Sequence, residues 1–192
     1  MPISSPVLTA LYAGDTAGAR HAAAGRELDV HEAAALGDAE RIEALLAADP
    51  AQAAAVAEDG YSPLHLVAFF SGDARIARAL VDAGAPVSVH ATNDMAVTPL
   101  NSAAAASAND VAAVLVAAGA EVDAAMAGGY TPLHAAAANG DTVMVDLLLE
   151  HGADPSRRTR DGQAAADLAA ARGHELLAGR VRERAAAARS AP

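Results

Sequence analysis

Apolar residues recur along the chain with a spacing typical of paired, antiparallel helices. In residues 128–160 a first helix is predicted to begin at Pro132, and Asn139-Gly140-Asp141 interrupts it. Residues 143–151 predict a second, longer helix, which Gly152 ends because glycine readily takes the left-handed conformation past a helix. The residues predicted to face neighbouring units are Leu133, Ala136, Ala137, Leu147, Leu148 and Leu149.

A four-residue phrase opens the first helix and recurs at an interval of about 33 residues. Its clear copies are Ser62-Pro63-Leu64-His65, Thr98-Pro99-Leu100-Asn101 and Thr131-Pro132-Leu133-His134. In each copy the serine or threonine can cap the helix, and the proline occupies the first turn, where no backbone N–H is needed. A repeat of this length predicts that the chain is built by stacking one helical unit.

The phrase, its interval and the closing pairs Gly84-Ala85, Gly119-Ala120 and Gly152-Ala153 together resemble the ankyrin repeat. The resemblance implies an all-α helical solenoid, in which stacked antiparallel helix pairs are joined by β-hairpin-like loops. It covers nearly the whole chain, so we expect one domain over residues 1–187 and a tail, 188–192. Within the domain we expect a degenerate N-terminal helical pair (5–27), four repeats (28–58, 59–95, 96–127 and 128–160) and a C-terminal capping repeat (161–187).

The terminal units depart from the phrase. We align the first repeat on Leu28-Asp29-Val30-His31 and the last on Ala164-Ala165-Ala166-Asp167, and both have lost the proline. The pair at 5–27 begins at a weaker phrase, Ser5-Pro6-Val7-Leu8, and is expected to cap the stack, because an uncapped terminal repeat exposes its apolar face to water. Equivalent positions in the second helices predict buried residues at Leu45, Leu80, Leu115, Leu148 and Val181.

Two insertions interrupt the regular repeat length. Residues 69–72 contain one residue more than 138–140, and the segment 84–98 contains two more than its counterparts. Insertions in repeat proteins map to loops on one face, often the binding face, so residues 88–95 form a candidate contact loop. The alternative is a loop that is tolerated without a function.

The ankyrin resemblance implies that the concave surface of hairpins and first helices is the usual contact face. Aromatic side chains provide large contact areas at low conformational cost, and Tyr61, Phe69, Phe70 and Tyr130 fall on this face. One of the two phenylalanines can instead pack into the adjacent repeat. The full set of candidate protein-binding residues is Tyr61, Phe69, Phe70, His90, Asn93, Met95, Val97, Tyr130, Asn139, Arg158 and Gln163.

Charge is unevenly distributed along the 192 residues. The net charge is -11, which divides into -15 for residues 1–156 (20 acids against 5 arginines) and +4 for residues 157–192 (4 acids against 8 arginines). An acidic body repels phosphate, which disfavours nucleic-acid binding and favours a basic or mixed-charge protein partner. The chain contains no cysteine, no apolar stretch long enough to span a membrane and no secretion signal, so we expect a cytoplasmic monomer without membrane contact.

The histidines at 31, 65 and 134 are aligned to one repeat position, and the ankyrin resemblance implies that they make structural hydrogen bonds there. A zinc-protease helix would need histidine at position 35, which is Ala35. Asp38, Asp73 and Asp141 precede second helices and are interpreted as caps.

No nucleophile elbow, phosphate loop or dinucleotide glycine pattern occurs in the sequence. We therefore expect no catalytic residue, no cofactor and no metal, and interpret the chain as a non-catalytic adaptor, scaffold or regulator that binds a protein. Two alternatives remain open: a regulatory, immunity or stress partner of an enzyme, and an enzyme with an undetected site.

Overall fold

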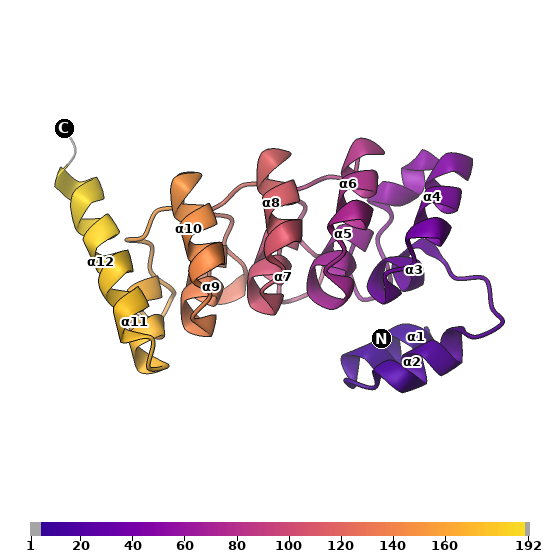
Figure 1. The fold of residues 1–192 in the computed structure, drawn as a ribbon, viewed down its shortest axis with the longest axis horizontal. Helices are drawn as coiled ribbons and strands as arrows, with labels where there is room; N and C mark the ends of the chain where they lie inside the picture. The colour runs from indigo at the N-terminus through magenta and orange to yellow at the C-terminus, as the bar shows by residue number, and fades with distance from the viewer. Residues whose placement is uncertain (1–4, 191–192) are drawn as a thin grey trace.

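Antiparallel helix pairs stand side by side in a row in the computed structural model, which describes residues 5–190 (Figure 1). The two helices α1 and α2 lie beside α3 at the N-terminal end, and the chain ends in α12 at the opposite end of the row. The α-helices are α1 (Pro6–Tyr12), α2 (Thr16–Ala23), α3 (Val30–Leu36), α4 (Ala39–Ala48), α5 (Pro63–Leu66), α6 (Ala74–Asp82), α7 (Pro99–Ala106), α8 (Asn109–Ala117), α9 (Pro132–Asn139), α10 (Thr142–Glu150), α11 (Ala165–Ala171) and α12 (Glu175–Ser190).

Three short helical segments of other types complete the secondary structure: η1 (Pro50–Ala54) and η3 (Ala127–Gly129) are 3-10 helices, and η2 (Val67–Ser71) is a π-helix. Between residues 5 and 190 there is no strand, only an isolated antiparallel bridge between Arg158 and Ala164. The predicted all-α solenoid is therefore confirmed.

The recurring phrase begins the first helices as predicted. Ser62, Thr98 and Thr131 are the N-cap residues of α5, α7 and α9, and each is followed by proline. Asp38, Asp73 and Asp141 are the N-caps of α4, α6 and α10, where each carboxylate accepts a hydrogen bond from a backbone N–H of the first turn. These caps fix where each helix begins, and hence the length of each connecting segment.

The third helical residue of each first helix ties its repeat to the next hairpin. The side chains of His65, Asn101 and His134 accept hydrogen bonds from the backbone N–H of their N-cap residues. At their other ends, His65 Nε2 lies 3.0 Å from the Val97 carbonyl oxygen, Asn101 Nδ2 lies 3.3 Å from that of Ala124, and His134 Nε2 lies 3.2 Å from that of Gln163. Because a carbonyl can only accept, both histidines donate from Nε2 and accept at Nδ1, which makes them neutral.

The core follows the predicted positions except in the first repeat. Leu80, Leu115, Leu148 and Val181 are fully buried, whereas Leu147 and Leu149 are partly buried against the core. In the first repeat Leu46 is buried and Leu45 only partly, so the prediction for Leu45 is wrong. Helix α4 packs against α3, α6 and η1. Its buried Leu46 follows Glu32 by fourteen residues, the same spacing as from Asn101 to Leu115 and from His134 to Leu148.

The alignment of the first repeat is also wrong by one residue at its start. Asp29 is the N-cap of α3 and Glu32 is the third helical residue, so Glu32, and not His31, corresponds to His65. The reason is that the Asp29 carboxylate accepts from the backbone N–H groups of His31 and Glu32, which starts the helix at Val30. Glu32 is buried and also accepts a 2.7 Å hydrogen bond from Ser5 Oγ, which fastens the N-terminal helical pair to the first repeat.

Candidate functional site

Successive hairpins are joined into a ladder by backbone hydrogen bonds. Within the hairpins, the amides of Ala57, Ala91, Met126 and Thr159 donate to the carbonyls of Tyr61, Val97, Tyr130 and Gln163. Between hairpins, the amides of Thr92, Ala127 and Arg160 donate to the carbonyls of Gly60, Met95 and Gly128. The ladder holds side chains from different repeats at fixed positions along one face.

The hairpin closed by Ala91 and Val97 is longer than the other three, and its additional residues include Met95. Its closing bond spans five intervening residues, from Ala91 to Val97, where the other three hairpins have three. Asn93 anchors the extra residues, because its side-chain amide donates to the Asp59 carbonyl at 2.8 Å and its Oδ1 accepts from the Met95 amide at 3.1 Å. The Met95 side chain remains 50 % exposed. The two-residue insertion is therefore ordered by the preceding hairpin.

The one-residue insertion at 69–72 is absorbed by η2 and does not form a loop. In a π-helix one extra residue fits into a turn without ending the helix. Gly72 then ends the element with φ of +63°, and its amide donates to the Val67 carbonyl at 2.8 Å. This widened turn carries Phe69, which is 50 % exposed, and Phe70, which is partly buried against the core.

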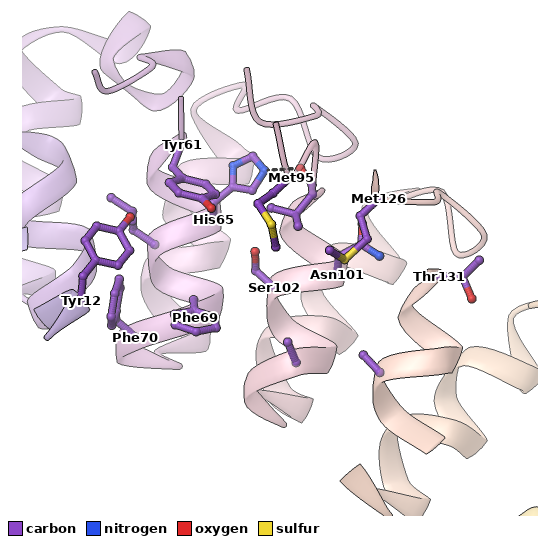
Figure 2. A pocket seen from close by; sticks show the side chains of 14 residues that line it. Tyr12, Tyr61, His65, Phe69, Phe70, Met95, Asn101, Ser102, Met126 and Thr131 are labelled. Carbon is purple, nitrogen blue, oxygen red and sulfur yellow. Dashed lines mark hydrogen bonds between the residues drawn. The ribbon is translucent and has the colours of Figure 1, made fainter. Parts of the chain in front are cut away.

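Four aromatic side chains form a continuous wall at this point (Figure 2). The ring of Phe70 lies 5.1 Å from that of Tyr12 and 5.1 Å from that of Phe69, edge to face in each case. The Tyr12 ring lies 6.4 Å from that of Tyr61, and its hydroxyl donates to Asp59 Oδ2 at 2.9 Å. We call Tyr12, Tyr61, Phe69 and Phe70 the aromatic wall. Edge-to-face packing at these distances is favourable beyond the area it buries.

The aromatic wall borders a groove of about 310 Å³ that crosses three repeats on the hairpin and first-helix face. Figure 2 shows the wall on one side, Met95 and Met126 projecting from the hairpins, and Asn101, Ser102 and Thr131 further along the row. We call this the aromatic groove. Its lining residues are Tyr12, Tyr61, His65, Leu66, Phe69, Phe70, Met95, Val97, Asn101, Ser102, Ala105, Met126, Thr131 and Ala135.

The surroundings of two titratable groups in the groove shift their pKa values in the direction that favours the neutral form. Burial lowers the pKa of His65 from its ordinary value of 6.5, and the bond to the Val97 carbonyl only partly opposes this shift. Burial, followed by the neighbouring Asp59 carboxylate, raises the pKa of the Tyr12 hydroxyl well above its ordinary range. Both groups are engaged in hydrogen bonds within the protein, so the groove presents a largely apolar surface.

Five of the eleven predicted contact residues line the groove: Tyr61, Phe69, Phe70, Met95 and Val97. Val97 is buried and contributes its backbone to the ladder. The other six lie elsewhere. Asn93 anchors the hairpin, and Asn139 donates to the carbonyls of Ala104 and Ala105 at the end of α7. His90, Tyr130, Arg158 and Gln163 lie on the hairpins outside the groove.

Tyr12 is the main groove residue that the sequence reasoning missed. A signal was present, because aligning Ser5 with Ser62 places Tyr12 at the position of Phe69, the end of a first helix. The pairing itself could not be foreseen, since Tyr12 and Asp59 are 47 residues apart. The methionine Met126 was missed as well, and only the ladder places it beside Met95.

Two kinds of feature are absent from the part of the chain that the structure describes. Among residues 5–190 no group of three or more His, Asp or Glu side chains is arranged to hold a metal ion. Nor does any helix in that range combine the length and apolar character that crossing a bilayer requires.

Comparison with known families gives two matches that together span most of the repeats. Residues 128–160 match the family model for a single ankyrin repeat, and residues 30–126 match the family model for three copies of the ankyrin repeat. Among curated proteins, none matches this chain. Ankyrin repeats are generally protein–protein interaction modules and are typically non-catalytic. With its helix pairs, capped phrases and hairpin ladder, the chain belongs to the ankyrin-repeat family.

Proposed function

We propose that this protein is a non-catalytic interaction module that binds a protein partner in the aromatic groove, on the concave hairpin and first-helix face. The observation that carries the proposal is the pairing of two half-exposed apolar side chains, Phe69 and Met95, at one apolar groove. Phe69 and Met95 lie in the two insertions, at 69–72 and 84–98, that distinguish the repeat at 59–95 from its neighbours.

The groove has the physical features of a binding hot spot. Aromatic side chains clustered in an apolar depression lose little conformational entropy on binding and bury large areas. Methionine adapts to irregular partner surfaces, and Met95 and Met126 project from the hairpins beside the rigid aromatic wall. Because the hairpin ladder fixes the backbone, the partner does not have to order it on binding.

The non-catalytic character is supported by the state of the polar groups in the groove. The imidazole of His65 bridges the Ser62 N-cap and the Val97 carbonyl, and the Tyr12 hydroxyl is bonded to Asp59. A general acid or base needs a proton-transfer group that can reach a substrate. A regulator of an enzyme would use the same groove and would differ only in the identity of its partner.

Replacing the exposed groove side chains tests the proposal. We expect Phe69→Ser and Met95→Ser to weaken partner capture from the source cell lysate by at least about tenfold, as loss of a hot-spot contact does. Leu176→Ser is the matched control, because Leu176 is 89 % exposed on α12, far from the groove. Circular dichroism should show unchanged helix content for all three variants. Capture of the same partners at the same yield by Phe69→Ser would contradict the proposal.

A further inference from the structure

The hairpins differ in charge along the row, and the aromatic groove lies under the acidic ones. We number the hairpins by their residues: the first is 55–61, the second 88–97, the third 121–130 and the fourth 154–163. The first three contain no lysine or arginine; their acids are Glu58 and Asp59, Asp94, and Glu121 and Asp123, and the second also contains His90. The fourth carries Arg157, Arg158 and Arg160 against Asp154 and Asp161.

Each acidic hairpin also contributes a side chain to the groove. Asp59 is close in sequence to Tyr61, Asp94 to Met95 and Asp123 to Met126, and these three neighbours line the groove. Glu58, Asp94 and Glu121 are exposed on these hairpins, and Asp94 directly precedes the lining residue Met95. The fourth hairpin contributes no lining residue. The groove is therefore apolar inside, it is lined from hairpins whose outer residues are acidic, and a basic hairpin follows them along the row.

The basic hairpin is exposed and only partly neutralised. Arg157, Arg158 and Arg160 all lie on the surface. Arg158 is paired with Asp167 at 3.6 Å and donates to the Gly162 carbonyl. The hairpin row thus presents a negative and then a positive potential along one line, from the second repeat to the last.

From this arrangement we infer the chemistry of the partner at the proposed binding site: the groove takes a linear protein segment with a bulky apolar anchor flanked by arginine or lysine. The segment lies along the hairpin row, its basic residues over the first three hairpins and any acidic residues toward 157–160. Rim charges that stay solvated cost little to bring together, steer association and fix the orientation of the ligand. This inference rests on the proposed function, because it assumes that the aromatic groove is the binding site.

Selection of peptides from a phage-displayed library of random 12-residue sequences, on the full chain, tests this inference. We expect enriched peptides to contain Phe, Leu, Ile, Met or Trp next to arginine or lysine, with acids depleted on that side. Synthetic copies of these peptides should bind Phe69→Ser at least about tenfold more weakly than the parent protein. Their affinity should also fall as salt rises, because exposed charges are screened.

Charge variants separate the rim from the groove. We expect the double variant Asp94→Asn with Glu121→Gln to weaken the selected peptides about threefold, the size typical of exposed ion pairs. Glu175→Gln is the matched control and should leave binding unchanged, since Glu175 is exposed in the first turn of α12, at the far end of the row from the groove.

The outcomes distinguish the two proposals. Enriched peptides that are acidic or uncharged, yet lose affinity on Phe69→Ser, would overturn the inference and leave the proposed function standing. Enriched peptides that bind Phe69→Ser as well as the parent protein would overturn the proposed function. A library that yields no enriched sequence would overturn the inference that the ligand is a linear protein segment. Sedimentation equilibrium of the protein alone completes the test, because a salt-sensitive dimer abolished by Phe69→Ser would make a second copy the occupant.

Discussion

The repeats at 59–95 and 128–160 share one framework but differ in what they add to it. His65 Nδ1 lies 2.8 Å from Ser62 Oγ, and His134 Nδ1 lies 2.8 Å from Thr131 Oγ1. Leu64 and Leu133 are buried alike, and Gly72 and Gly140 both follow the first helices with positive φ. Between these shared points, the repeat at 59–95 has a π-helical turn and a longer hairpin, whereas 128–160 has neither.

The comparison shows that the framework and the recognition surface are specified by different residues. The shared serine or threonine, leucine and histidine are buried in both repeats, where they make helix caps, core contacts and links to the next hairpin. The additional residues place Phe69 and Met95 at half exposure in the groove, whereas the regular repeat leads into a shorter hairpin with Asp161 and Gly162 before its closing residue. Insertions at the ends of elements can change a surface without disturbing a core, because the stacked contacts lie elsewhere.

The largest expected effect tests whether the buried leucines of the two compared repeats contribute equally to the free energy of unfolding. We expect Leu64→Ala and Leu133→Ala each to lower the free energy of unfolding by about 2–5 kcal/mol, because each leaves a cavity between stacked helices. Urea denaturation followed by circular dichroism measures the change. Leu176→Ala, at an exposed site, should change stability by less than about 0.5 kcal/mol. A large cost in one repeat and none in the other would break the comparison.

The next effect concerns the buried histidine that links each cap to the following hairpin. His65→Ala and His134→Ala should each cost about 1–3 kcal/mol of unfolding free energy, since the N-cap amide and the hairpin carbonyl lose their partner. Urea denaturation at pH 8 measures this cost. The two values should agree closely, and a negligible cost at either site would show that the bridge does not hold the hairpin.

The same two histidines predict a pH dependence of stability. Burial lowers the pKa of His65 and of His134 below the ordinary value of 6.5, so the folded protein favours the neutral form. The unfolded chain then binds more protons, and this contribution is complete above pH 6.5 and is lost as the pH falls through the folded-state pKa values. The urea concentration at the unfolding midpoint should therefore decrease as the pH is lowered from 8 to 5.

The chain itself supplies the control for this pH dependence. Asn101 occupies the equivalent position and makes the same two links without titrating. The double variant His65→Asn with His134→Asn should therefore fold with a weaker dependence of the urea midpoint on pH below 6.5. An unchanged slope would assign the pH dependence to other groups.

The smallest effect concerns the residue that ends the first helix. Between the two compared repeats, Ser107 takes the left-handed conformation, with φ of 55°, at the position where Gly72 and Gly140 stand. Ser107→Gly should stabilise the protein by about 1 kcal/mol, because a side chain is disfavoured in that conformation. Gly72→Ser is the reverse test and should destabilise by a similar amount, since a Cβ there meets no atom within 4 Å. Thermal unfolding detects both, and changes of the same sign would refute the explanation.

Much of the fold could be predicted because local signals and tertiary packing agree in the central repeats. Ser62, Thr98 and Thr131 cap helices whatever surrounds them, and the interval between them sets the stacking. The alignment of the first repeat was wrong because the sequence allows Asp29 at either of two adjacent positions of the phrase. Only the hydrogen bonds from the His31 and Glu32 amides to its carboxylate show that Asp29 is the N-cap. The error at Leu45 follows from the same shift, because the count of fourteen residues that runs from Asn101 to Leu115 runs from Glu32 to Leu46, which is buried.

The candidate site was only partly predictable. The positions of Phe69 and Met95 follow from the repeat alignment, but the sequence gives no sign that one insertion becomes a π-helical turn and the other an anchored loop. Asn93 and Asn139 were expected on a binding surface, and in the structure their amides bond backbone carbonyls of neighbouring repeats. A polar side chain near a hairpin can serve either purpose, and only its distance to a carbonyl shows which.

The sequence by itself determined the repeat, the start of most helices, the residues of the core and the division of charge along the chain. These properties depend on spacing and on capping, which act over a few residues. Only the tertiary structure decided that Tyr12 joins Tyr61, Phe69 and Phe70 in one wall, and that Met95 and Met126 stand beside it. The reason is physical: the ladder and the Ser5–Glu32 bond bring together residues separated by tens of positions, and no local preference encodes that distance.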